Sequence, residues 1–197
     1  MKHICVYGSS SWDLDKKYIE PVEHLGQRMA QRGFGLVFGG GAQGLMGAVA
    51  RGMKKEDGVI LGVAPEFFDT DGVLYKECTD FIYPANMRER KEIMEEASDA
   101  FIVTPGGVGT WEEFFEVFTL KQLQQINKPI VIFNIDHYYD LLLDFIEKGI
   151  EGTFIKEACK KLYYVSDDVE DILDYIENYN EKPIVVKAMR TVITEDN

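Results

Sequence analysis

A glycine-rich turn between an apolar run and a helical pattern constrains the fold of this chain more than any other feature. Residues 99–103 are mostly apolar and partly β-branched, which is typical of a buried strand. The stretch that follows, at 104–113, reads Thr-Pro-Gly-Gly-Val-Gly-Thr-Trp-Glu-Glu and leads into a helical pattern. Because glycine has no Cβ, Gly106, Gly107 and Gly109 allow the backbone to approach a ligand closely.

The start of the helix after this turn predicts an anion site. The first N–H groups of a helix have no intrahelical partner, and they carry a partial positive charge that attracts phosphate. We expect Thr110 to be the N-cap, with Glu113 three residues later completing a capping box. The alternative is a well-capped helix that binds no ligand.

Strand-like and helical patterns alternate along the whole chain. Because the strands are apolar on both faces, the predicted fold is α/β, a doubly wound parallel sheet with helices on both faces. Such sheets bind ligands at the carboxyl ends of their strands, where the glycine turns lie. The predicted strands are 2–8, 34–38, 59–63, 81–83, 99–103, 129–133 and 163–165, and the predicted helices are 14–32, 87–98, 111–125, 138–150 and 169–179, with one more after the glycine turn at 39–44.

Length and composition indicate one ordinary globular domain. A chain of 197 residues can bury ~70% of its unfolded surface. We expect a single Rossmann-like domain over 1–181 and a C-terminal tail over 182–197, in which residues 184–186 could dock. The charge of −13 argues against a nucleic-acid partner.

Cysteine usage and hydropathy bear on the compartment. Cys5, Cys78 and Cys159 are far apart, with neither disulfide nor metal-ligand spacing, so we expect no metal site. No apolar stretch approaches the ~20 residues of a membrane span, and no signal peptide is evident. The expected location is the cytoplasm, with no membrane contact.

A second glycine turn matches the dinucleotide fingerprint at Gly39, Gly41 and Gly44. The match is weak, because it follows the second strand, whereas the first turn, at 8–11, lacks the pattern. Neither glycine turn is followed by the Lys-Ser/Thr of a Walker loop. The histidines and the first-turn serines also lack the arrangement of a nucleophilic triad or a metal site.

Arg90 is the unusual member of an apolar helical stripe. It shares that stripe with Met87 and Met94, and a buried guanidinium requires an anionic partner. The alternative is that its head reaches solvent at the helix edge. Two anion-binding helix starts, Arg90 and the pair Glu112/Glu113 suit a phosphorylated sugar, because a carboxylate stabilises the oxocarbenium-like state of glycosidic cleavage. Arg90 stays protonated, so it would hold Glu113 ionised or bind phosphate.

The helix predicted over 111–125 is apolar around most of its circumference. Such a helix is buried on more than one side. In a domain of this size we expect one of those sides to be a subunit interface.

Three stretches resemble the LONELY GUY (LOG) family of cytokinin riboside 5′-monophosphate phosphoribohydrolases. They are residues 39–47, the Met-x-x-Arg-Lys motif at 87–91, and residues 105–113. The resemblance covers about residues 2–179. It implies a modified Rossmann fold and a homodimer with active sites at the subunit interface. It also implies that AMP or an N6-substituted AMP is hydrolysed, without a cofactor, to the free base and ribose 5-phosphate.

The resemblance also assigns site residues. Arg90 and Glu113 match the family's catalytic pair, and Arg88 stands where many members have histidine. The expected substrate-binding residues are Ser9, Gly41, Met87, Arg88, Lys91, Gly106, Gly107, Gly109 and Thr110. Two other hypotheses are a binding protein like the related molybdenum-cofactor carriers and a dinucleotide-binding oxidoreductase.

Overall fold

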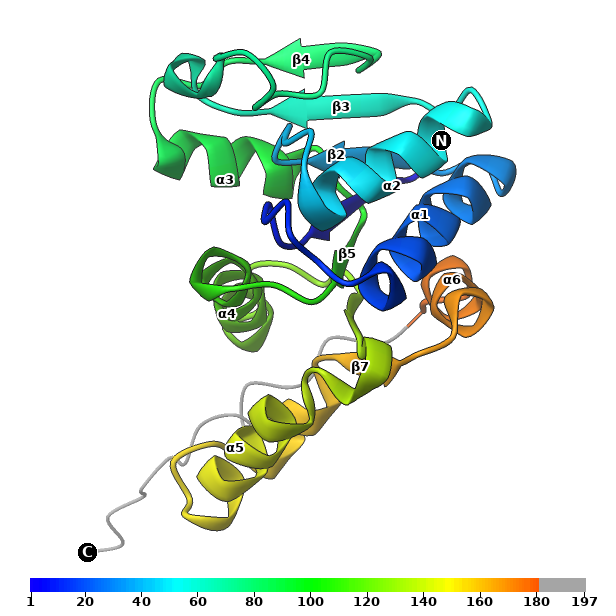
Figure 1. The fold of residues 1–197 in the computed structure, drawn as a ribbon. Coiled ribbons are helices and arrows are strands. Elements are labelled where there is room, and N and C mark those ends of the chain that lie inside the picture. Colours follow the sequence, from blue (N-terminus) through cyan, green and yellow to red (C-terminus); the bar gives the residue numbers. More distant parts are fainter. Residues whose placement is uncertain (181–197) are drawn as a thin grey trace, which may run out of the picture.

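The computed structural model describes residues 1–180, and the described strands form a single parallel sheet (Figure 1). The strand order is β4-β3-β2-β1-β5-β6-β7. The strands are β1 His3–Tyr7, β2 Gly35–Phe38, β3 Ile60–Val63, β4 Asp80–Ile82, β5 Ala100–Val103, β6 Ile130–Phe133 and β7 Tyr164–Ser166. The predicted tail at 182–197 lies outside the described residues.

Helices cover both faces of this sheet, which confirms the predicted doubly wound α/β fold. Residues of β1 show why: Ile4 and Val6 pack on one face with α1, α2 and α6, whereas Cys5 and Tyr7 pack on the other with α3, α4 and α5. Successive residues of a strand point to opposite faces, so both faces are apolar. The helices are α1 Lys16–Gln31, α2 Gly44–Lys55, α3 Met87–Glu96, α4 Val108–Gln122, α5 Asp140–Glu151 and α6 Val169–Glu177.

Helix boundaries differ from the prediction where caps decide them. Helix α1 begins two residues late, because the Asp15 side chain accepts a hydrogen bond from the Lys17 N–H at 3.0 Å and so caps the helix. Pro21 lies inside α1 and does not divide it. Helix α4 begins three residues early, because Gly107 is its N-cap.

The strand order places a topological switch between β1 and β5. From β1 the chain moves outward through β2 and β3 to β4, and then returns to β5 on the other side of β1. The loops that follow β1 and β5 therefore diverge to opposite faces and leave a crevice between them. In open α/β sheets this crevice is where ligands bind.

Candidate active site

A cavity of about 560 Å³ lies at this crevice. Four loops meet there: the serine turn after β1, the glycine turn after β2, the segment between β3 and β4, and the Pro-Gly-Gly turn after β5. Of the predicted site residues, it is lined by Ser9, Gly41, Arg90, Gly107, Gly109, Thr110 and Glu113. The fold thus brings together residues from four separate parts of the sequence.

Arg90 is buried at this cavity and has an anionic partner. It is 9% exposed, its Nε donates to the Val63 carbonyl at 3.1 Å, and its Nη2 lies 3.5 Å from Glu113 Oε1. A Cβ on Gly39 would lie 2.0 Å from the same Nη2, so glycine there leaves room for the guanidinium. The expectation that a buried Arg90 needs a partner is confirmed, and the alternative of a solvent-exposed head is wrong.

Glu113 lies on α4 with its carboxylate buried against Arg90. It is 9% exposed, and this burial raises its pKa to about 7, although the Arg90 charge opposes the rise. Desolvation is the largest cause of this raised pKa, and the charges of Glu112 and Glu116 add to it. Burial thus favours the protonated form of Glu113 while the Arg90 charge favours the ionised form, and pKa values perturbed in this way cluster at functional sites.

The N-terminus of α4 is open toward the cavity. Gly107 is the N-cap and has no side chain to cap the helix. Within residues 1–180, no acceptor is found for the N–H groups of Gly107, Val108, Gly109 and Thr110. These four donors, at the positive end of the helix, suit an anion.

The predicted capping box at this helix start is wrong. Thr110 lies inside the first turn of α4 and is buried, and the Glu113 side chain faces Arg90 instead of the backbone. A Cβ on Gly106 would lie 2.1 Å from Thr110 Oγ1, so Gly106 makes room for this side chain. The charged partner across the cavity therefore determines where Glu113 points.

The second glycine turn is closed, contrary to the prediction of two open anion sites. The Ser9 carbonyl accepts hydrogen bonds from the Leu45 N–H at 2.8 Å and the Met46 N–H at 3.4 Å in the first turn of α2. Gly44 has a φ of 60°, and a Cβ there would lie 2.4 Å from the Ser9 oxygen. The Ser9 carbonyl, from the turn after β1, thus takes the place that an anion would occupy at the start of α2.

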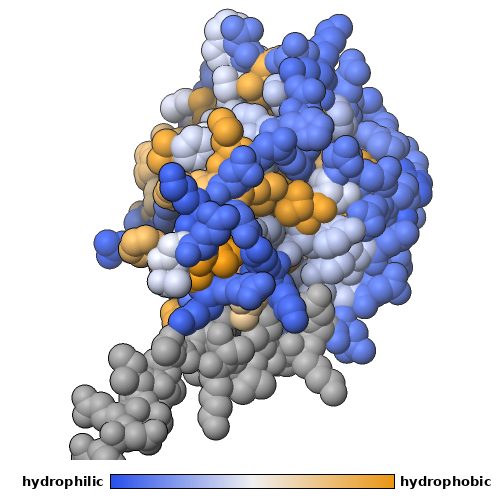
Figure 2. All heavy atoms as spheres, turned by 90° about the horizontal axis from the view of Figure 1, so that it is seen from below, coloured by the Kyte–Doolittle hydropathy of each residue, from blue (hydrophilic) through white to orange (hydrophobic). Residues whose placement is uncertain are grey.

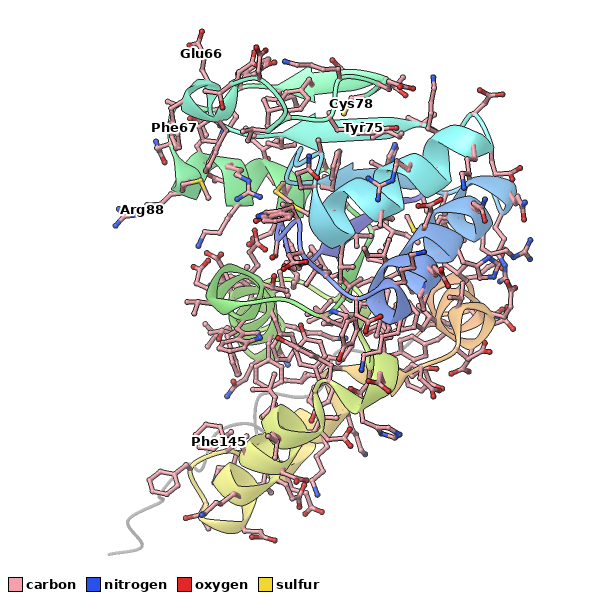
Figure 3. All side chains as sticks on the ribbon, viewed as in Figure 1. Glu66, Phe67, Tyr75, Cys78, Arg88 and Phe145 are labelled. Atoms are coloured by element: carbon pink, nitrogen blue, oxygen red, sulfur yellow. The ribbon has the colours of Figure 1, made fainter. Side chains whose placement is uncertain are left out.

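Four predicted site residues do not line the cavity. Met87 contacts Arg90, with its Sδ 3.9 Å from Nη1, and the Gly106 carbonyl accepts from the Tyr138 hydroxyl. Lys91 forms ion pairs with Glu112 and, at 2.7 Å, with Glu116 on α4. Arg88 is exposed and projects outward from the first turn of α3 (Figure 3).

Several residues that line the cavity were not predicted. Phe68, Val73 and Leu74 come from a segment that the sequence leaves irregular, and the bridge between Leu74 and Gly41 brings it to the site. Met46 follows the second glycine turn, so its place in the Gly-Leu-Met-Gly stretch is a signal that could have found it. The remaining members of this set are Gly8, Ser10, Ser11, Gly39, Gln43 and Gly72.

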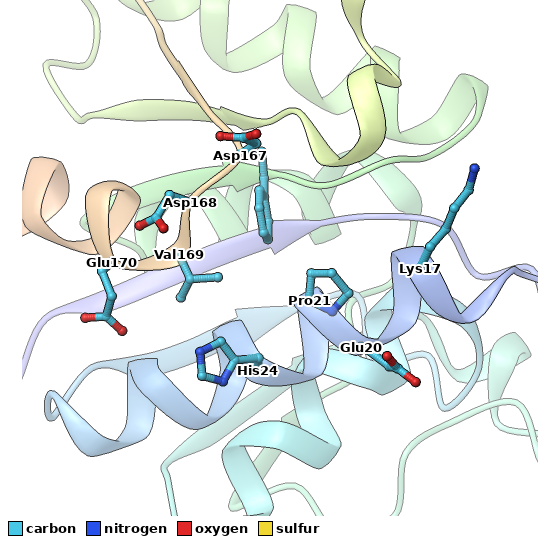
Figure 4. Close-up of a pocket in the computed structure, with 9 residues that line it drawn as sticks. Lys17, Glu20, Pro21, His24, Asp167, Asp168, Val169 and Glu170 are labelled. Carbon is cyan, nitrogen blue, oxygen red and sulfur yellow. The ribbon is translucent and has the colours of Figure 1, made fainter.

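A second hollow, of about 440 Å³, lies between α1 and α6 (Figure 4). It is lined by the acidic residues Glu20, Asp167, Asp168 and Glu170 and is therefore unsuited to an anion. Glu170 is paired with Arg28 and Arg32, whose guanidinium groups lower its pKa to about 2. Asp168 is the N-cap of α6, where its side chain accepts a hydrogen bond from the Asp171 N–H at 2.8 Å.

Within the described residues, no group of three or more His, Cys, Asp or Glu side chains could hold a metal ion. No helix in that range is long and apolar enough to cross a membrane.

Known proteins are similar to this chain over most of its length. A family model described as "Possible lysine decarboxylase" matches residues 46–176. A probable cytokinin riboside 5′-monophosphate phosphoribohydrolase of Oryza sativa subsp. japonica is 36% identical over 194 residues, which is 96% of this chain and 77% of that protein. The chain belongs to the LOG family of phosphoribohydrolases. A cytokinin riboside 5′-monophosphate phosphoribohydrolase of Arabidopsis thaliana is 34% identical over 93% of this chain and 79% of its own length.

Solved structures resemble the fold of this LOG-family chain. The molybdenum cofactor binding protein of Rippkaea orientalis has a TM-score of 0.67 at 21% identity, over 89% of this chain and 95% of its own. The Moco carrier protein of Chlamydomonas reinhardtii gives the same TM-score, identity and coverage. At such identity the likeness concerns the fold alone.

Proposed function

We propose that this chain hydrolyses the N-glycosidic bond of a nucleoside 5′-monophosphate, either AMP or an N6-substituted AMP such as a cytokinin riboside 5′-monophosphate. Water adds to the anomeric carbon while the bond to the base breaks, giving ribose 5-phosphate and the free base. One observation carries the proposal: a buried carboxylate, paired with a buried guanidinium, faces the same cavity as an open helix N-terminus.

Each part of the cavity has a role in this reaction. The free N–H groups from Gly107 to Thr110 would bind the 5′-phosphate. Glu113, one helical turn further along α4, would then face the sugar, where its carboxylate stabilises the positive charge that develops at the anomeric carbon. Arg90 favours the ionised form of that carboxylate.

The apolar wall of the cavity supports a base as the leaving group. Met46, Phe68, Val73 and Leu74 contribute apolar side chains to the lining, whereas the Pro-Gly-Gly turn contributes N–H groups. A flat heteroaromatic ring buries well against such side chains, whereas the phosphate needs the polar end. The cavity therefore offers lining groups suited to each half of a nucleotide.

We also propose a homodimer whose interface includes α4. The outer side of this helix exposes Val108 by 76%, together with Trp111, Phe115 and Leu123, while Phe114 and Val117 are buried against the sheet. On α5, Phe145 is 70% exposed and projects from the molecule (Figure 3). Figure 2 shows apolar side chains gathered among polar ones on the face seen from below. Exposed apolar side chains on the helix that carries Glu113 favour a subunit contact beside the site.

Product analysis tests the hydrolase. The purified protein is incubated with AMP and, separately, with isopentenyl-AMP, and ribose 5-phosphate and free base are quantified. Release of either base supports the proposal, and the ratio of the two kcat/KM values identifies the preferred substrate. No release of either base contradicts it. Arg90→Ala should have a lowered kcat that saturating substrate does not restore, because Arg90 acts on the Glu113 carboxylate in the transition state.

Carriage of a molybdenum cofactor is the competing function, because the solved neighbours that bear such names share the fold. The Arg90–Glu113 pair favours hydrolysis, since a carrier has no need of a carboxylate that titrates near neutral pH. Tightly bound molybdopterin in the purified protein, together with the absence of hydrolysis, would favour the carrier.

A further inference from the structure

The three carbonyl groups of the turn at 104–106 are all held by hydrogen bonds. The Thr104 carbonyl accepts from the Tyr139 hydroxyl at 2.7 Å, and the Pro105 carbonyl accepts from the Ser9 N–H at 3.1 Å. The Gly106 carbonyl accepts from the Tyr138 hydroxyl at 2.7 Å. Three acceptors that would repel an anion are thereby occupied by other parts of the protein.

The carbonyl of Gly106 determines where the next N–H group points. A trans peptide is planar, with its C=O and N–H groups directed oppositely. Because the Gly106 C=O is directed to Tyr138, the Gly107 N–H is directed to the other side of the chain. Gly107 lines the cavity and Gly106 does not, so this N–H belongs to the open helix start.

The backbone before Tyr138 is built to present its side chain. Asp136 and His137 both have positive φ, at 50° and 60°, which non-glycine residues rarely adopt. The Asn134 Oδ1 accepts from the Tyr139 N–H at 2.7 Å and fixes the end of this turn. Such strain persists only where the surroundings over-determine it, and it is common beside functional sites.

The ring of Tyr138 is also held by its neighbours. It packs edge-on against Tyr18 of α1, with centroids 6.0 Å apart, and against Tyr139 at 4.9 Å. Lys17, next to Tyr18, forms an ion pair with Asp136. Tyr138 is therefore held in place by α1 and by the turn after β6. The residues of these two segments that contact it do not line the cavity.

We infer that Tyr138 is a positioning residue, which holds the Gly106–Gly107 peptide so that its N–H group binds the phosphate of the substrate. This inference rests on the proposed function. Without the hydroxyl, the Gly106 carbonyl has no partner and the peptide is free to rotate, which would bring a carbonyl dipole toward the phosphate. The hydroxyl acts through the peptide, so it should affect phosphate binding more than the step at the sugar.

Tyr138→Phe tests the role of the hydroxyl, because it keeps the ring contacts with Tyr18 and Tyr139. We expect KM for the nucleotide and Kd for ribose 5-phosphate to rise about tenfold, as one lost hydrogen bond allows, with kcat changed less than twofold. Calorimetry with ribose 5-phosphate gives a readout that does not depend on turnover. The matched control is Tyr164→Phe. The Tyr164 hydroxyl donates to Asp171 at 2.8 Å and does not line the cavity, so its loss should change neither KM nor Kd.

The outcomes separate this inference from the proposed function. A variant that binds ribose 5-phosphate as the wild type does, while the wild type hydrolyses nucleotides, overturns the inference alone. A fall in kcat with unchanged Kd also overturns it, because it would place the hydroxyl in the chemical step. A wild type that neither hydrolyses nucleotides nor binds ribose 5-phosphate removes both.

Discussion

The two glycine-rich helix starts of this protein look alike in sequence but differ in their hydrogen bonding. At α2, the Ser9 carbonyl occupies the N–H groups of Leu45 and Met46. At α4, the N–H groups from Gly107 to Thr110 have no acceptor within residues 1–180, and the nearby carbonyls are turned elsewhere. Glycine permits close approach in both cases, by the protein's own backbone at α2 and by a ligand at α4.

This contrast shows that one kind of turn can serve structure or binding. The closed turn positions Gly39 under Arg90, and the open turn leads to Glu113. The pair that we place at the reaction centre therefore depends on both turns. Substitutions in the two turns should have different consequences, which the following experiments measure.

The largest effect is expected at the carboxylate beyond the open turn. Glu113→Gln should lower kcat by about 10³-fold or more, because the amide cannot stabilise a developing cation, while the fold remains intact. Steady-state kinetics and circular dichroism measure the two properties. Glu112→Gln is the control, since its partner is Lys91 rather than Arg90. Near-wild-type kcat in Glu113→Gln would remove Glu113 from the mechanism.

The pH dependence of stability should reveal the same group. The pKa of Glu113 is raised from 4.5 to about 7 in the fold, so its contribution to stability is fully present below pH 4.5 and is lost as the pH rises through 7. Glu113→Gln lacks this loss. The free energy of unfolding of Glu113→Gln, relative to that of the wild type, should therefore rise by roughly 3 kcal/mol as the pH is raised from below 4.5 to 8.

Urea unfolding of both proteins at several pH values gives this difference directly. Other titrating groups, such as Glu95, whose pKa burial raises to about 7, occur in both proteins and cancel in the comparison. A difference that is constant with pH would show that Glu113 has an ordinary pKa.

A methyl group at Gly39, in the closed turn, should disturb the Arg90–Glu113 pair. Gly39→Ala would place its Cβ against the Arg90 guanidinium and move it from Glu113, so we expect kcat/KM to fall about a hundredfold. The midpoint of the acid limb of the pH–rate profile should also move to higher pH, because Arg90 lowers the pKa of Glu113. In the Arg90→Ala background the same substitution should have no further effect, and an additive loss would show that Gly39 acts independently.

The smallest effects compare one glycine from each turn. Gly44→Ala forces a positive φ on alanine and places Cβ against the Ser9 oxygen, so it should destabilise the fold by about 2 kcal/mol. Gly107 has a negative φ, and a Cβ added there would meet no atom within 4 Å beyond its chain neighbours. Gly107→Ala should therefore change stability by less than about 0.5 kcal/mol.

The binding measurement reverses the order. Gly107→Ala adds a methyl group to the cavity wall, and we expect its affinity for ribose 5-phosphate to fall about tenfold. Thermal unfolding and calorimetry on the two variants provide all four values. Equal losses of stability in both would contradict the distinction between a closed and an open turn.

Much of the fold could be predicted because its determinants are local. The residues that make up an apolar run such as 99–103, or the apolar stripe of a helix such as α3, lie within a few positions of one another in the sequence. The position of Arg90 on an apolar stripe also predicted an anionic partner. The predicted capping box was wrong because the Glu113 carboxylate could accept from the helix backbone or pair with a cation. Arg90, distant in the sequence, supplies that cation.

The sequence by itself determined the alternation of strands and helices, the glycine turns at the strand ends and the need of Arg90 for a counter-charge. The tertiary structure decided the strand order, the cavity between β1 and β5, and which turn stays open. The physical reason is that an N–H group is available to a ligand only if no other segment reaches it. Ser9 reaches α2, whereas Tyr138 and Tyr139 hold back the carbonyls beside α4.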